Sequence, residues 1–255
     1  MLYRIRDALL GQTVNRKKET RFVYLHIPKT AGSAVKASIV GSRAKRRFIS
    51  KPHPIAFEDL SPRERGMETF VTIRQPVPWY LSMYNFKMHS DGGKGYDTLA
   101  ESRLENFLDD VVFARNGLDG VMKWNRPVEH KQHIVRMLKP YFESGAHERI
   151  GFLTLNFLFY TSRRWREALV ATDPVAAVTQ NRDSLIEIRH VLRQEALSDD
   201  FARMVGAVDP GLNLDQRVNA MSTNPYLSAL DADVITRIEH RDRFILSEFY
   251  GWNMA

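Results

Sequence analysis

Cysteine is absent from the 255 residues of this chain, which excludes disulfides, thiolate metal sites and a cysteine nucleophile. No apolar run approaches the ~20 residues of a membrane-spanning helix. The opening stretch MLYRIRDALLGQTVNRKKET also lacks the apolar core and cleavage site of a signal peptide. It predicts at most a peripheral helix over residues 1–20, without stable membrane insertion. From these absences we expect a cytoplasmic protein.

Positive charge, in contrast, is in excess. The chain has 37 Lys and Arg against 30 Asp and Glu, a formal net charge of +7. Such a surplus favours an anionic partner, which could be a nucleic acid, a nucleotide or an acidic glycan. The densest cluster is RAKRRFISK at 43–51, with five basic residues. It is either an anion-binding segment or a solvated segment between a helix and a strand.

Short apolar strands alternate with helices, a pattern that predicts an α/β fold around a central parallel sheet. A length of 255 residues suits one large domain, and no repeat or linker interrupts it, so we expect a single domain over 1–255 with a helix-rich C-terminal half. Strands are expected at 21–27, 47–50, 68–74, 150–154 and 188–194. Helices are expected at 33–40, 61–66, 79–89, 129–139, 156–170, 197–207 and 232–250, with a further start signal at Thr98 and Glu101 and a loop at 90–97.

The joint after the first expected strand has an unusual composition. In RFVYLHIPKTAGSAVKASIVG, residues 21–41, the strand runs into Pro-Lys-Thr-Ala-Gly-Ser and then into a helix. Backbone N–H groups at a helix N-terminus, together with the helix dipole, favour a phosphate or sulfate. Gly32 would let the backbone approach that anion, Thr30 and Ser33 would add hydroxyl donors, and Lys29 would add charge. The alternative is an ordinary helix start capped by Ser33.

A nucleoside-triphosphate P-loop, G-x-x-x-x-G-K-[ST], is the obvious competing motif. Its lysine follows the last glycine, whereas Lys29 precedes Gly32 and no upstream glycine stands at the required spacing. The stretch GGKG at 92–95 lacks the Ser or Thr that should follow the lysine. The P-loop interpretation is therefore weak.

The order Lys-Thr-x-Gly-Ser resembles the 5′-phosphosulfate loop of the carbohydrate sulfotransferases, which use 3′-phosphoadenosine 5′-phosphosulfate (PAPS). A second match is IRQPVPWYLSMY, similar to the R-D-P-x-x-R-x-x-S motif of that family, with Arg74 and Ser82 at the same spacing. Gln75 and Trp79 replace the usual Asp and Arg, and Ala34 stands where Ser or Thr is common. The resemblance covers residues 22–84. A weaker likeness in RVNAMSTNP makes Asn219 and Ser222 candidates near the nucleotide.

This resemblance implies a P-loop-like three-layer sandwich and a PAPS-dependent sulfotransferase that transfers a sulfuryl group to a hydroxyl, on a carbohydrate that could be acidic, without a metal. The residues it assigns to the donor are Lys29, Thr30, Ala31, Gly32, Ser33, Arg74 and Ser82. Lys29 would also act in catalysis, as would a base.

The base that we expect is His53, in RRFISKPHPIAFEDL. Histidine, with an ordinary pKa near 6.5, is well suited to accept a proton near neutral pH. The position follows the second strand, where the heparan-type members of the resembling family carry a catalytic histidine. If His53 is only a loop residue between two prolines, Glu58 or Asp59 becomes the candidate base.

Other constellations are weaker. Glu129, His130 and His133 lie close together, but not at H-E-x-x-H spacing, and an exposed helix face explains them as well as a metal site. His26 is expected to be a structural histidine in its strand. The tetrad RRWR at 163–166 resembles a single-strand nucleic-acid surface, but also a helix with a buried Trp165. A nucleotide-dependent kinase and a basic nucleic-acid-binding module remain the alternatives to a sulfotransferase.

Overall fold

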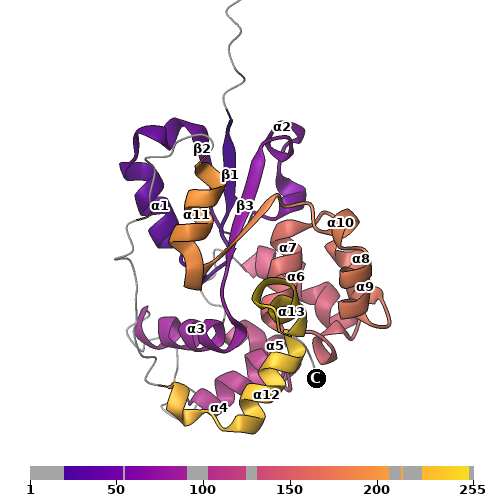
Figure 1. Cartoon of the computed structure of the whole chain (residues 1–255). Helices are drawn as coiled ribbons and strands as arrows, with labels where there is room; N and C mark the ends of the chain where they lie inside the picture. Colours follow the sequence, from indigo (N-terminus) through magenta and orange to yellow (C-terminus); the bar gives the residue numbers. More distant parts are fainter. Residues whose placement is uncertain are drawn as a thin grey trace, which may run out of the picture.

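A parallel sheet organises the chain (Figure 1). The computed structural model describes residues 20–53, 55–90, 103–124, 131–206, 214 and 226–252, and these form one four-stranded sheet. Its strands are β1 (Phe22–Leu25), β2 (Phe48–Lys51), β3 (Glu68–Ile73) and β4 (His190–Arg193), in the order β2-β1-β3-β4. Phe22 lies opposite both Phe48 and Glu68, and Phe70 lies opposite His190. Because every strand runs the same way, the residues after their carboxyl ends meet at one edge.

The side chains of β1 alternate between two cores. Phe22 and Tyr24 belong to a cluster with α1 (Gly32–Gly41) and α11 (Leu197–Val205). Val23 and Leu25 belong to a larger cluster with the helices of the opposite face. Figure 1 shows α1 and α11 on one side of the sheet and α7 (Phe152–Thr161) on the other. Apolar residues on both faces of a strand are typical of a parallel sheet covered by helices.

The connections differ greatly in length. α1 and η1 (Arg43–Arg47) join β1 to β2, and η2 (Phe57–Asp59) and α2 (Pro62–Arg65) join β2 to β3. The connection from β3 to β4 contains α3 (Pro76–Ser90), α4 (Leu104–Phe107), the π-helical η3 (Leu108–Val112), α5 (Gly117–Lys123), α6 (Lys131–Glu143), η5 (Ala146–Glu148), α7, α8 (Trp165–Val170), α9 (Pro174–Gln180) and α10 (Arg182–Leu185). After β4 come η6 (Gln194–Ala196), α11, η7 (Leu227–Ala229), α12 (Ala232–Arg241) and α13 (Arg243–Tyr250).

The α/β class, the parallel sheet and the helix-rich second half agree with expectation. The short helix at 61–66 is confirmed as α2, with Ser61 and Glu64 forming its capping box. Some of the expected features lie outside the described residues, namely Thr98, Glu101, the part of the 90–97 loop after Ser90, and residues 1–19. The helices expected at 156–170 and 232–250 are each divided in two, the second at Asp242.

The strand expected at 150–154 is wrong, because α7 begins there. All ten residues of α7 are buried, so its sequence FLTLNFLFYT has no polar face to reveal a helical period. Its start is held by Asp242, whose carboxylate accepts hydrogen bonds from the Thr154 backbone N–H (2.8 Å) and the Tyr80 hydroxyl (2.9 Å). The Tyr80 hydroxyl in turn accepts one from the Phe152 N–H at 2.8 Å. A carboxylate from far along the chain therefore caps this helix.

Candidate active site

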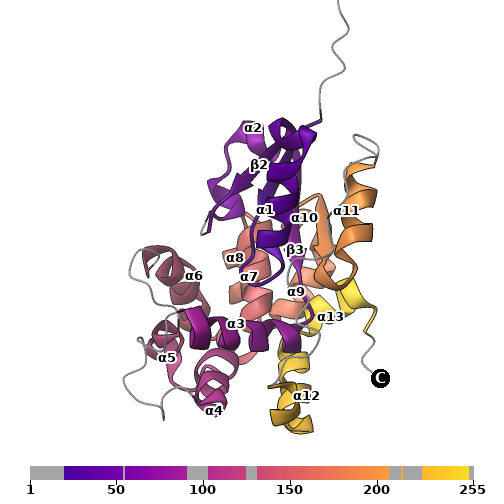
Figure 2. The same ribbon diagram turned by 90° about the vertical axis from the view of Figure 1, so that its left-hand side faces the viewer.

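The carboxyl ends of the strands bring the predicted site residues to one edge of the sheet. β1 leads into the β1–α1 loop (residues 26–31), β2 into His53 and β3 into Arg74. The chain leaves β1 toward β2 but leaves β3 toward β4, so the topology switches between β1 and β3. Ligands of open α/β sheets bind at such a switch point. α3 lies beyond this edge, facing the start of α1 (Figure 2).

Two residues of the β1–α1 loop adopt left-handed backbone conformations. Lys29 has φ 64° and Ala31 has φ 72°, which residues with a side chain rarely adopt. Alternation of left-handed and other conformations turns successive N–H groups toward one point and favours an anion there. α1 starts at Gly32 with Ala31 as its N-cap, and no side chain among the described residues caps it. Ser33 is exposed inside the helix, so the expected alternative of a Ser33 cap does not form.

Thr30 points inward rather than toward the helix start. It is fully buried, and its hydroxyl lies 2.7 Å from the Ile27 carbonyl, to which it donates, and 2.8 Å from the Thr72 hydroxyl. The Tyr24 hydroxyl lies 2.8 Å from the same Thr72 oxygen. This chain of hydroxyls ties the β1–α1 loop to β3. The Thr30 hydroxyl was expected to face an anion, and in this structure it has a structural task instead.

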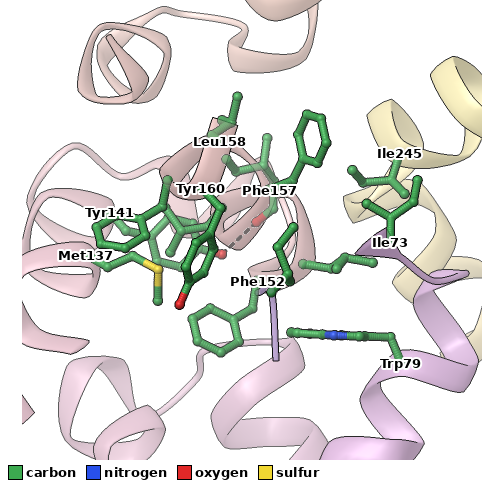
Figure 3. Packing of buried hydrophobic residues seen from close by; sticks show 14 of the residues in the cluster. Ile73, Trp79, Met137, Tyr141, Phe152, Phe157, Leu158, Tyr160 and Ile245 are labelled. Carbon is green, nitrogen blue, oxygen red and sulfur yellow. Dashed lines mark hydrogen bonds between the residues drawn. The ribbon is translucent and has the colours of Figure 1, made fainter. Parts of the chain in front are cut away.

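Trp79 holds the β1–α1 loop from the side of α3. The indole is fully buried, and its Nε1 donates a hydrogen bond of 2.8 Å to the Pro28 carbonyl. Figure 3 shows the ring beside Phe152. Trp79 stands where the resembling motif has an arginine. From the sequence, Trp79 was expected only as an apolar residue of a helix. The structure shows that it fixes the loop backbone.

Lys29 and Arg74 form the positive part of the site, and both are half-buried. Burial lowers the pKa of the Lys29 ammonium, and the charge of Arg74 lowers it further. Burial also lowers the pKa of Arg74, against the influence of Glu195 and Tyr250. Two cations that destabilise each other in a half-buried place form a site that an anion would stabilise.

The Lys29 ammonium lies over the ring of Phe86 on α3, 4.3 Å from its centroid. Ser82 is one helical turn before Phe86 and therefore shares the side of α3 that faces the β1–α1 loop. Arg74 directly precedes the same helix. The structure thus brings Lys29 together with Arg74, and places Ser82 on the adjoining helix face. Phe86, 48% exposed, was not predicted as a site residue.

His53 meets His26 at the ends of β2 and β1. The ring centroids are 3.9 Å apart, with 36° between the planes. His26 also lies against Gly32, because a Cβ built there would fall 1.8 Å from His26 Nε2. The space that makes glycine necessary at position 32 is thus filled by imidazole in this structure. Burial and the neighbouring positive charges lower the pKa of His26 to about 2.

The alternative bases, Glu58 and Asp59, are engaged elsewhere. Glu58 accepts hydrogen bonds from Arg136 (2.8 Å) and Arg166 (2.9 Å). Burial alone would raise the pKa of Glu58, but these arginines and Trp165 lower it overall. Asp59 caps the Ala56 N–H of η2 and pairs with Arg136. Both carboxylates thus have partners within the fold, at η2 and its neighbouring helices.

The remaining candidate segments do not join this site. The RRWR tetrad at 163–166 has Trp165 fully buried, and its arginines pair with Glu187, Glu167 and Glu58, as in the structural interpretation. The basic segment η1 immediately precedes β2, at the end of the sheet opposite the β1–α1 loop (Figure 1). This part of the segment 43–51 therefore lies away from the site, whereas its last residue, Lys51, ends β2 at the carboxyl edge and pairs with Glu64.

Some predictions fall outside the described residues. These include Asn219, Ser222, Glu129, His130 and the side chain of His133. Within the described part of the chain, no group of three or more His, Asp or Glu side chains is arranged to hold a metal ion. No helix of that part has the length and apolar character needed to cross a membrane.

Glu195, just after β4, is a site residue that the sequence did not reveal. It accepts hydrogen bonds from the Gln75 N–H (3.0 Å) and the Tyr250 hydroxyl (2.7 Å). This joins the end of α13 to the start of α3, next to Arg74. No local pattern connects these residues, because 55 positions separate Glu195 from Tyr250.

Comparison with models of known protein families, with curated proteins and with solved structures finds no match for this chain.

Proposed function

We propose that this protein is a PAPS-dependent sulfotransferase with a P-loop-like fold, acting on a hydroxyl of a carbohydrate. The observation that carries the proposal is the position of Lys29 and Arg74 after the neighbouring strands β1 and β3, at the switch point of the sheet. Two half-buried cations beside an uncapped helix start suit a ligand with two separate anionic groups. PAPS has such groups, a 5′-phosphosulfate and a 3′-phosphate.

In the proposed reaction the acceptor oxygen forms a bond to sulfur as the bond from sulfur to the 5′-phosphate oxygen breaks. The acceptor proton goes to His53, and negative charge builds on the departing phosphate oxygen. Lys29 is assigned to that oxygen, where a fixed cation stabilises the transition state more than the ground state. The Lys29 ammonium lies over the Phe86 ring of α3, 4.3 Å from its centroid, on the side of α3 that faces the β1–α1 loop.

Arg74 and Ser82 are assigned to the 3′-phosphate, the group that distinguishes PAPS from ATP. A guanidinium can give two charge-assisted hydrogen bonds to one phosphate. The backbone N–H groups of residues 30–33 are assigned to the 5′-phosphosulfate. Thr30 contributes its backbone there, since its hydroxyl is committed to Ile27 and Thr72.

Isothermal titration with three ligands tests the donor class. We expect adenosine 3′,5′-bisphosphate (PAP) to bind more tightly than ATP with magnesium or an oligonucleotide. A preference for magnesium-ATP would favour a kinase, and a preference for the oligonucleotide would favour a nucleic-acid-binding module. Either result would remove the sulfotransferase proposal.

Variants test the assigned roles, with labelled PAPS and a panel of glycans and lipid-linked saccharides as acceptors. Lys29→Ala should lower kcat by about 10²–10³-fold, the usual cost of one lost transition-state contact, and should lower PAP affinity far less. His53→Ala should abolish transfer while PAP still binds. The control is Lys139→Ala, an exposed lysine paired with Glu143 on α6, which should behave as wild type. An unchanged kcat in Lys29→Ala would refute its role.

A further inference from the structure

His26 connects two parts of the proposed site that come from different strands. Its ring lies against Gly32, at the start of α1, and against the tilted ring of His53, after β2. We propose that His26 is a positioning residue that transmits the state of the donor loop to the base His53. This inference rests on the proposed function, but its central contact can be tested without any reaction.

Contact with Gly32 leaves the His26 ring no freedom on that side. A methyl group at position 32 would lie 1.8 Å from Nε2 and 2.0 Å from Cδ2, so the ring itself would have to move. His26 Nδ1 is buried and has no hydrogen-bond partner among the described residues. The ring is packed so closely against Gly32 that a displacement of Gly32 toward it would move the ring.

The charge state of His26 suits this role. Four titratable groups face it: Tyr24 from β1, Lys29 from the β1–α1 loop, Lys36 from α1, and His53. Burial and the positive charges of His53, Lys36 and Lys29 keep the His26 ring neutral down to acidic pH. A neutral His26 ring can stay in contact with His53 when His53 takes up the acceptor proton. If His26 were also protonated, the two imidazolium rings would repel each other.

Gly32→Ala and His26→Ala, alone and combined, test the contact by PAP titration. Gly32→Ala should weaken PAP binding about tenfold, because the added methyl displaces the ring and the loop with it. His26→Ala makes room for that methyl, so the double variant should bind PAP within about threefold of His26→Ala alone. Gly41→Ala, with open space for a Cβ in the same helix, is the matched control and should bind normally. A double variant as weak as Gly32→Ala would show that the glycine serves the ligand, and would overturn the proposal.

Nuclear magnetic resonance of the His53 ring protons tests the transmission. His53→Gln identifies these resonances. In the wild type, PAP should shift them, and in His26→Ala the shift should disappear although titration calorimetry still detects PAP binding. His190→Ala, on β4, the edge strand farthest from β2, is the control and should retain the shift. An undiminished shift in His26→Ala would refute transmission through His26.

Failure of the proposed function and failure of the positioning role of His26 give different results. If PAP does not bind the wild type at all, the proposed function fails. Without ligand, the His53 resonances should still move in Gly32→Ala and in His26→Ala, because both substitutions disturb the contact between the His26 and His53 rings. Resonances that stay unchanged in both variants would refute the positional link itself.

Discussion

Replacing Trp79 by phenylalanine tests how the β1–α1 loop is held in place. The substitution keeps an aromatic ring in the core but removes the indole N–H, whose 2.8 Å hydrogen bond to the Pro28 carbonyl is a side-chain tether of the loop to α3. The Trp79 indole is fully buried and its hydrogen bond is part-buried, so water reaches the Pro28 carbonyl less freely than in the unfolded chain. The variant should therefore lose both stability and donor affinity.

The expected loss in the free energy of unfolding has two contributions, the lost hydrogen bond and the cavity left by the smaller ring. Loss of this part-buried hydrogen bond, which leaves the Pro28 carbonyl without its indole donor, costs about 1–3 kcal/mol. The smaller ring leaves a partial cavity worth about 1 kcal/mol, well below the cost of truncation to alanine. The free energy of unfolding should therefore fall by about 2–4 kcal/mol, which a domain with about 5–15 kcal/mol can sustain. If about 1 kcal/mol of this is loop ordering that PAP must restore, the dissociation constant of PAP rises about fivefold.

Urea unfolding measures the free energy of unfolding, and calorimetric titration measures the dissociation constant of PAP. The matched control is Trp124→Phe, because Trp124 is also buried and its Nε1 donates a 2.8 Å hydrogen bond, to Asp110, outside the candidate site. It should lose similar stability and keep its PAP affinity. Equal weakening of PAP in both variants, or no weakening in Trp79→Phe, would refute the assignment of a tethering role to Trp79.

Three further predictions concern single residues. Arg74→Ala should weaken PAP about 10–100-fold but adenosine 5′-phosphate only slightly, and equal weakening in calorimetry would contradict its assignment to the 3′-phosphate. Tyr80→Phe should lower the free energy of unfolding by about 2–4 kcal/mol in urea, since the Asp242 carboxylate and the Phe152 N–H both lose a buried partner. Between pH 6.5 and pH 5 the wild type should lose about 2 kcal/mol more stability than His26→Phe. Over that range the unfolded imidazole takes up a proton that the buried one, with a pKa lowered to about 2, cannot accept; parallel stability curves would exclude this.

Local sequence patterns were enough to predict the general frame. Strands and helices alternate with their own hydrophobic periods, and this predicted the parallel sheet. Ser61 and Glu64 predicted the start of α2, because a capping box depends only on residues three positions apart. The placement of Lys29, His53 and Arg74 after three consecutive strands could also be predicted, since parallel strands end at one edge.

Where packing overrides the local pattern, the predictions failed. The segment 150–154 has apolar residues without a period, and only its burial on all sides, with Asp242 at its start, makes it the beginning of a helix. Ser33 could cap a helix by its chemistry, but the left-handed turn at Ala31 makes the chain enter α1 one residue before it. The hydroxyl of Thr30 turns inward because Thr72, on the neighbouring strand, offers it a buried partner.

The sequence by itself thus determined which residues stand beside the sheet edge, because order along the chain and strand direction decide that. Only the tertiary structure decided which of them touch. The His26–His53 stack requires β2 to lie next to β1, and the link from Glu195 to Gln75 and Tyr250 requires β4 next to β3 and α13 beside both. These neighbours depend on strand order and on packing between distant segments, and a single sequence contains no local signal for either.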